Sequence, residues 1–141
     1  FRPVRAINFK DREKLPPVTH VWIRAVDMLA DTPSLHQNLL AYVSDYELLG
    51  ASTLPHELSY AADNVIMASL DHALWFHREF RIDQWLLYSI DSPNASGARG
   101  FSRGQFFNEQ GTLVASSTQE GLVRVVDPAR ASKRSDPKAQ H

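Results

Sequence analysis

Asp45 is the residue of this sequence whose surroundings point most directly to chemistry. It lies in the run 32–50, which is rich in apolar residues and whose only formal charges are Asp45 and Glu47. An unpaired carboxylate removed from water is costly, so Asp45 must be hydrogen-bonded, solvated in a cavity, or shifted to a higher pKa. Each of these outcomes would mark a functional site. The alternative is that Asp45 lies on a solvent-exposed edge beside Glu47.

Asp71 and His72 are a second group with acid–base character, because a carboxylate and an imidazole follow one another in the chain. Adjacent residues of a strand point to opposite faces of the sheet, so the two are not expected to act on one atom, and we favour a structural role for both. The same argument separates His72 from His77, and we expect neither a metal site nor a cofactor. The other histidines before position 100 are far apart in the sequence: His20, His36 and His56.

The composition limits the possible partners and chemistries. The chain has 141 residues, 43% of them hydrophobic, with a formal net charge of −1 and no cysteine. This length and apolar content predict one domain with a real core, and the charge gives no basis for binding nucleic acid or an anionic membrane. Without cysteine, a disulfide, a thiolate zinc site and a cysteine nucleophile are excluded. No apolar run reaches membrane-spanning length and no signal segment is apparent, so we expect a cytoplasmic protein.

Asp45 must be positioned by the element that contains it, and the run 32–50 has the signals of a helix. Thr32 or Ser34 can cap its first turn, Pro33 has the φ of a first helical position, and Gly50 suits a left-handed C-terminal stop. Apolar residues occur on both sides, which predicts a helix buried on nearly every side. One face carries Leu35, Leu39, Tyr42, Val43, Tyr46 and Leu49, and the other Leu40, Ala41 and Leu48.

The rest of the chain favours strands. Runs rich in β-branched and aromatic residues predict strands at 18–26, 65–80, 84–90, 99–108 and 113–126, with a hairpin turn at 108–111. About five strands can surround one helix only if a strongly twisted antiparallel sheet curls around it. We therefore predict an α+β protein with the hot-dog fold.

The chain divides into three parts by composition. We expect a linker at 1–17, a hot-dog domain at 18–126 and a disordered tail at 127–141, which lacks apolar periodicity. The first residue is Phe1 and an irregular basic stretch follows, so the chain is expected to be the second part of a longer polypeptide. The strand beginning at Val65 is apolar on both faces, which predicts a partner domain or subunit.

Several segments, in the same order, resemble the C-terminal half of the type II (TesB-like) acyl-CoA thioesterases. They are 40–45 (LAYVSD), 67–77 (MASLDHALWFH), 85–88 (WLLY), 98–101 (ARGF) and 118–121 (TQEG). Members of that family consist of two hot-dog repeats, and the similarity covers roughly residues 3–126. The resemblance implies a catalytic set of Asp45, Ser69 and Gln119, with either serine or threonine accepted at the second place. The N-terminal repeat, which in the resembling proteins shares the acyl and coenzyme A surfaces, is absent from these 141 residues.

The chemistry of a thioesterase suits these residue types. Hydrolysis needs a water held against an electrophilic carbonyl, a base to take its proton, and dipoles that stabilise the developing oxyanion. Asp45 could serve as the base, with the Ser69 hydroxyl and the Gln119 amide fixing the same water. We also consider Arg99 and Arg103 as ligands for coenzyme A phosphates, although salt bridges at the strand ends explain them equally well.

We predict an acyl-CoA thioesterase that hydrolyses fatty acyl-CoA, with an N-terminal hot-dog repeat as partner and a homo-oligomer as its assembly. Two alternatives stay open. The first is an enoyl-CoA hydratase or dehydratase of the same fold, which the eleven-residue gap from Asp45 to His56 fits poorly. The second is a non-catalytic half that only completes the site of a partner.

Overall fold

The computed structural model describes residues 1–6, 14–58 and 64–126. The predicted tail at 127–141 and part of the predicted linker lie outside these ranges, and the division into domains stays a prediction. The elements are β1 (Arg2–Pro3), β2 (Val18–Ile23), α1 (Pro33–Val43), the 3₁₀ helix η1 (Leu49–His56), β3 (Val65–Ser69), β4 (Ala73–Phe76), β5 (Leu86–Ser96), β6 (Arg99–Asn108) and β7 (Leu113–Val125).

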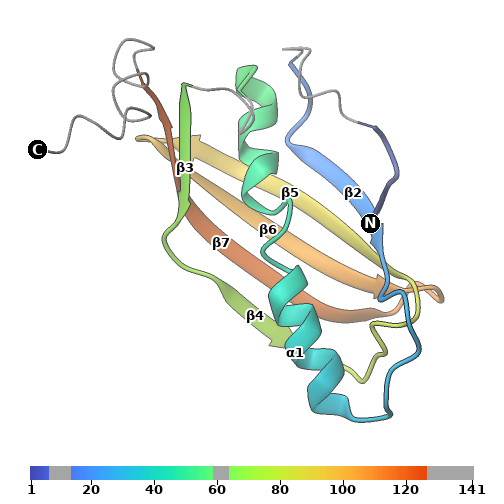
Figure 1. The fold of residues 1–141 in the computed structure, drawn as a ribbon. Coiled ribbons are helices and arrows are strands. Elements are labelled where there is room, and N and C mark those ends of the chain that lie inside the picture. The colour runs from blue at the N-terminus through green and yellow to red at the C-terminus, as the bar shows by residue number, and fades with distance from the viewer. Residues whose placement is uncertain (7–13, 59–63, 127–141) are drawn as a thin grey trace, which may run out of the picture.

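One antiparallel sheet contains every strand, in the order β1-β2-β5-β6-β7-β3, with β4 also paired to β7. The sheet curls, and α1 and η1 follow one another across its inner face (Figure 1). Alternation along β5 explains why that face is apolar, because Leu86, Tyr88 and Ile90 are buried while the residues between them are only half-buried. The predicted hot-dog arrangement of a curved antiparallel sheet around a central helical segment is confirmed.

The predicted helix at 32–50 is divided in two. Its start agrees with the prediction, since Thr32 is the extended N-cap residue and Pro33 opens the first turn. Its end does not, because α1 stops at Val43, Glu47 adopts a left-handed φ of 63°, and Gly50 lies inside η1. A left-handed residue cannot continue a right-handed helix, so the chain turns between the two helices. Asp45 therefore lies in this turn.

The prediction that this segment is buried on nearly every side is wrong. The buried residues are His36, Leu40 and Ser44, spaced four residues apart, followed by Leu48 and Leu49 where η1 begins. Tyr42 and Tyr46 are 67% and 46% exposed, with their hydroxyl oxygens 3.0 Å apart. The sheet thus covers one face of this segment, and the two tyrosines leave an aromatic surface on another.

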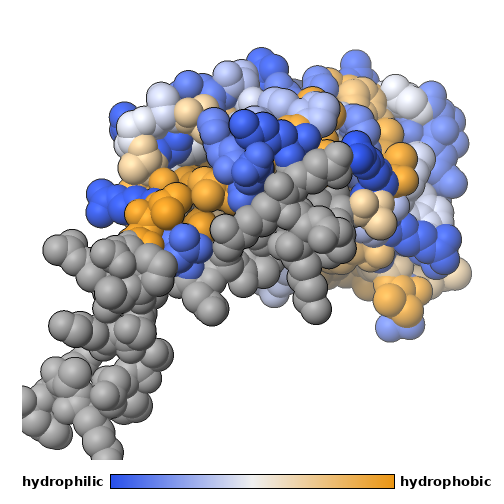
Figure 2. Space-filling model, turned by 90° about the horizontal axis from the view of Figure 1, so that it is seen from above, coloured by the Kyte–Doolittle hydropathy of each residue, from blue (hydrophilic) through white to orange (hydrophobic). Residues whose placement is uncertain are grey.

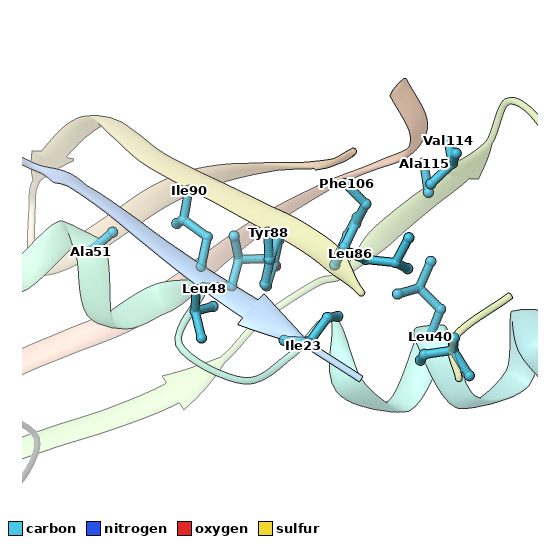
Figure 3. Packing of buried hydrophobic residues seen from close by; sticks show 12 residues of the cluster. Ile23, Leu40, Leu48, Ala51, Leu86, Tyr88, Ile90, Phe106, Val114 and Ala115 are labelled. Carbon is cyan, nitrogen blue, oxygen red and sulfur yellow. The ribbon is translucent and has the colours of Figure 1, made fainter. Parts of the chain in front are cut away.

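The core lies between η1, the end of α1 and the inner face of the sheet. Tyr88 from β5 stacks on Phe106 from β6, with ring centroids 4.0 Å apart. Figure 3 shows Leu48 facing Tyr88 and Ile90 across the core, and Leu40 packed nearer to the other end. Phe106 is fully buried and belongs to this core.

Two glycines let η1 lie directly on the sheet. Gly100 of β6 and Gly121 of β7 are cross-strand partners. A Cβ atom at Gly121 would lie 2.2 Å from Leu49 Cδ2, and one at Gly100 would lie 2.2 Å from Ser52 Oγ. Neither position has space for a side chain, so these glycines set the close approach of helix to sheet.

The predicted strand at 65–80 is broken into β3 and β4. Between them the N–H groups of Leu70 and Asp71 both donate to the carbonyl of Glu120, and Asp71 Oδ1 accepts the Glu120 N–H at 2.7 Å. One carbonyl therefore serves two successive donors, the regular ladder is interrupted, and the chain rejoins β7 at Ala73. The prediction of a continuous strand missed this break, which contains His72.

Apolar side chains are exposed along the broken strand. Leu70 is 56% exposed, and Trp75 and Phe76 of β4 are 49% and 40% exposed. Hydrophobic groups also reach the surface among hydrophilic ones in the view from above (Figure 2). In the described part of the chain, neither helix combines the length and the hydropathy needed to span a membrane.

Candidate active site

Three polar side chains from distant parts of the sequence meet beside the inner face of the sheet. They are Asp45 in the turn after α1, Ser69 at the end of β3, and Gln119 in the middle of β7. The Gln119 Nε2 atom donates one hydrogen bond to Asp45 Oδ1 at 2.5 Å and another to Ser69 Oγ at 3.0 Å. The amide group thus links the carboxylate and the hydroxyl.

The strand register explains how Ser69 and Gln119 come together. Ser69 is the cross-strand partner of Gly121 on β7, two residues from Gln119 and on the same face of that strand. Gln119 itself pairs with Ser102 of β6 and points to the inner face, where it is 1% exposed. An ionised carboxylate only accepts hydrogen bonds, so the Gln119 amide must present its NH₂ group to Asp45.

Exposure differs sharply within the group. Gln119 is buried, whereas Asp45 and Ser69 are exposed in this chain. Both alternatives that the sequence left open for Asp45 therefore hold in part, since the side chain is hydrogen-bonded and also faces solvent. The arrangement offers a carboxylate that can take a proton from water and a hydroxyl beside it, both oriented by one buried amide.

No ion pair within residues 1–6, 14–58 and 64–126 includes Asp45. Two residues later, burial raises the pKa of the Glu47 carboxyl. At the residue directly after Asp45, the hydrogen bond to Tyr42 raises the pKa of the Tyr46 phenol. The immediate neighbours of Asp45 thus supply no cation.

A second set of contacts holds the residue before Asp45. Ser44 is fully buried and its Oγ lies 2.8 Å from His72 Nε2, while the Tyr88 hydroxyl donates to the Ser44 carbonyl at 2.6 Å. Sequence reasoning singled out neither Ser44 nor Tyr88, because each acquires its partner only in the folded chain. Their presence in two of the segments that carry the family resemblance was the only signal available.

Arg99 and Arg103 do not join Asp45, Ser69 and Gln119. Arg103 pairs with Thr118 on β7 and so faces the outer side of the sheet, where it forms a bidentate contact with Asp91. Arg99 lies 3.6 Å from Glu120. Both are engaged in ion pairs, and their role in binding coenzyme A phosphates stays a prediction.

Asp71, His72 and His77, which the sequence analysis also considered, contact different partners. Asp71 contacts the backbone of Glu120 and His72 contacts Ser44, so the two do not act on a common atom. The Nε2 atom of His77 lies 2.9 Å from Ser116 Oγ.

A cleft of about 630 Å³ opens near the other end of α1. Its lining includes His36, Arg78 and Trp85, and none of Asp45, Ser69 and Gln119. Because a large cleft alone does not identify a site, the convergence of polar groups on Gln119 is the stronger indication of chemistry.

Proteins of one enzyme family are similar to this chain over most of its length. Residues 8–122 match the family model described as acyl-CoA thioesterase. The chain is 35% identical over 134 residues to acyl-coenzyme A thioesterase 8 of Homo sapiens, covering 94% of this chain and 41% of that protein. It is 38% identical over 111 residues to acyl-CoA thioesterase 2 of Haemophilus influenzae, covering 79% of this chain and 39% of that protein.

A solved structure is also similar to this chain over part of its own length. The crystal structure of acyl-CoA thioesterase II TesB2 from Mycobacterium marinum aligns with a TM-score of 0.71 and 46% identity, over 77% of this chain and 41% of that chain. This chain thus spans about two fifths of the length of the relatives that it matches. From the family match and these similarities, we conclude that the chain belongs to the acyl-CoA thioesterase family.

Proposed function

We propose that this chain is the C-terminal hot-dog half of an enzyme that hydrolyses fatty acyl-CoA to a fatty acid and coenzyme A. The observation that carries the proposal is the meeting of Asp45, Ser69 and Gln119 through the Gln119 amide. Gln119 is separated from the other two by 74 and 50 residues, and these two are open to an incoming water and substrate.

In the proposed reaction, a water molecule is held between the Asp45 carboxylate and the Ser69 hydroxyl. Asp45 takes one proton from this water, and the water oxygen bonds to the thioester carbonyl carbon. The carbon–sulfur bond then breaks, and the coenzyme A thiolate leaves and takes up the proton that Asp45 had removed. Gln119 holds the Asp45 carboxylate and the Ser69 hydroxyl in fixed relative positions throughout, which lowers the entropic cost of reaching the transition state.

A partner surface is part of the proposal. Asp45 and Ser69 are exposed, and Leu70, Trp75 and Phe76 extend an apolar surface along the neighbouring strand. Hydrolytic sites work best when bulk water is excluded. We therefore propose that an N-terminal hot-dog repeat, in the same chain or another, covers this surface and shares the substrate, and that such units form a homo-oligomer. Light scattering of the purified protein tests the assembly, and a monomeric chain that is already active would contradict it.

The test of the function is thiol release from a series of acyl-CoAs of increasing chain length. The chain is assayed alone and together with an N-terminal repeat from a relative, each with Asp45 intact and with Asp45→Asn. We expect hydrolysis by the intact protein and a loss of about a hundredfold or more for the variant, in the range for removal of a general base. Asp27→Asn, at an exposed aspartate in the loop before α1, should leave the rate unchanged.

The same preparations separate the alternatives. Hydration of an enoyl-CoA without thiol release would favour the hydratase and refute the thioesterase. Activity of the assembled protein that survives Asp45→Asn would identify this chain as a non-catalytic half. The cytoplasmic location predicted from the sequence also stays a proposal, and fractionation of cells that express the tagged full-length protein tests it.

A further inference from the structure

Ser44, the residue that directly precedes Asp45, is held by three hydrogen bonds that involve side chains. Its hydroxyl donates to the Ala41 carbonyl at 2.9 Å and lies 2.8 Å from His72 Nε2. The Tyr88 hydroxyl donates to its carbonyl at 2.6 Å. The three partners belong to α1, to the break between β3 and β4, and to β5, so Ser44 is fixed from three parts of the chain.

The direction of each bond follows from proton counting. A serine hydroxyl has one hydrogen, and Ser44 gives it to the Ala41 carbonyl. Ser44 Oγ must therefore accept a hydrogen bond from His72, which places a proton on His72 Nε2. With that proton committed to Ser44, His72 is not available as a general base at this nitrogen.

Tyr88 is fixed as firmly as the residue that it holds. Its side chain is fully buried and stacks on Phe106. Gly104 makes room for the ring, because a Cβ atom at that position would lie 2.3 Å from Tyr88 Cε2. Burial raises the pKa of the Tyr88 phenol, so the hydroxyl keeps the proton that it donates to Ser44.

Asp45 depends on this anchor because the helix no longer supports it. Regular α-helical structure ends at Val43, and Glu47 turns the chain into the left-handed region. The Asp45 side chain must nevertheless meet Gln119 on a strand 74 residues away. A small rotation of the Ser44 peptide would move the carboxylate away from Gln119, and misplacement by about 1 Å can cost about a hundredfold in rate.

We infer that His72 and Tyr88, acting through Ser44, are positioning residues that set the Asp45 carboxylate against Gln119 and Ser69. Neither is proposed to touch the substrate. The inference rests on the proposed function, since it concerns the base of that reaction. It also gives a purpose to the break between β3 and β4, because His72 lies in the break and leaves the strand alternation to reach Ser44.

The test compares His72→Ala with His72→Gln in the form of the protein that hydrolyses acyl-CoA. We expect His72→Ala to lower kcat by about tenfold to a hundredfold with KM changed by less than about twofold. His72→Gln should recover most of kcat, because its side-chain N–H can occupy the place of the imidazole Nε2–H. A general loss of structure would not be rescued in this way.

His77→Ala is the matched control. It removes a histidine whose Nε2 also lies 2.9 Å from a serine hydroxyl, that of Ser116, away from Asp45. This variant should keep the wild-type kcat. Ser44→Ala should resemble His72→Ala, and the double variant should lose little more, since both single changes remove the same hydrogen bond.

Outcomes for the function and for the inference can be told apart. If Asp45→Asn inactivates the enzyme while His72→Ala retains the wild-type kcat, the positioning role is refuted and the function stands. If Asp45→Asn remains active, the proposed function of the site fails first. NMR of the Gln119 side-chain amide decides the positioning role without any turnover. His72→Ala should move these signals toward those of Asp45→Ala, and unchanged signals would overturn the inference.

Discussion

Gln119 donates a hydrogen bond to the carboxylate of Asp45 at 2.5 Å, although the two residues are 74 positions apart in the sequence. The same amide nitrogen donates to Ser69 Oγ at 3.0 Å. Gln119 is therefore the buried centre of the group, and Asp45 and Ser69 are its two exposed ends.

Replacing Gln119 by glutamate should inactivate the enzyme at neutral pH. The change removes the NH₂ donor and places a second carboxylate beside Asp45, so we expect kcat to fall by about a hundredfold or more. Two carboxylates at one site raise the pKa of one of them, and the introduced carboxyl group, once protonated, could again donate to Asp45. Activity of Gln119→Glu should therefore recover in part as the pH is lowered, which a pH–rate profile measures.

Gln105→Glu is the control for this change. Gln105 lies on β6 and is exposed, so the same substitution there should leave both the rate and the pH profile unaltered. Wild-type activity of Gln119→Glu at neutral pH would contradict a role for the amide donor.

Ser69 is expected to tolerate threonine but not alanine. Its side chain is exposed, so the extra methyl group of Ser69→Thr meets open space while the hydroxyl is kept. Ser69→Ala removes a hydrogen-bonding group worth about 1–2 kcal/mol, which corresponds to a loss of about fivefold to thirtyfold in kcat. Steady-state kinetics of both variants checks this. Equal rates for Ser69→Ala and wild type would remove Ser69 from the site.

Gly121→Ala should destabilise the fold where η1 meets the sheet. The added Cβ would lie 2.2 Å from Leu49 Cδ2, so Leu49 and the helix must shift. Overpacking of this kind costs about 1–3 kcal/mol in the free energy of unfolding. Gly50→Ala is the control, because a Cβ there meets no atom within 4 Å. Urea unfolding measures both variants, and equal midpoints would contradict the close packing of η1.

The acid stability of the fold should depend on Asp83. Its carboxyl accepts two hydrogen bonds from the Arg81 guanidinium and one from the Leu29 N–H. The guanidinium and this N–H lower the pKa of Asp83 from 3.8 to about 2. A depressed pKa in the folded state means that the carboxylate stabilises the protein above its ordinary pKa and loses this contribution as the pH falls through the folded value.

Asp83→Asn lacks this titrating group. The difference in the free energy of unfolding between wild type and Asp83→Asn should be constant above about pH 5 and should shrink between about pH 5 and pH 2. Urea unfolding over this range measures the difference. A difference that does not change with pH would show that Asp83 and Arg81 do not stabilise the fold through their charges.

The sequence predicted the fold from local signals that act within a few residues. Pro33 and its neighbours marked the start of α1, and the β-branched and aromatic residues at 84–90 marked the strand that contains Tyr88. These signals are reliable because a proline ring or a β-branched or aromatic side chain acts within the segment itself. The end of α1 was misplaced because Gly50 is a strong local stop signal, whereas Glu47 adopts the left-handed conformation in the folded chain.

The break between β3 and β4 escaped prediction for a similar reason. The run from Val65 has the residue types of one continuous strand. What interrupts it is a tertiary arrangement, in which the Glu120 carbonyl accepts from both Leu70 and Asp71. The residue that turns toward Ser44 as a result, His72, was interpreted by strand alternation alone.

By itself, the sequence determined the residue types of the proposed site and, through a resemblance spread over several segments, the family. It also predicted a curled antiparallel sheet around a helical segment, since the hydrophobic pattern of each segment depends only on the residues of that segment. Only the tertiary structure decided that the Gln119 amide joins Asp45 to Ser69, that Tyr88 and His72 anchor Ser44, and that Arg103 faces the other side of the sheet. Hydrogen bonds between distant residues depend on strand register and on where each element ends, and no local pattern encodes either.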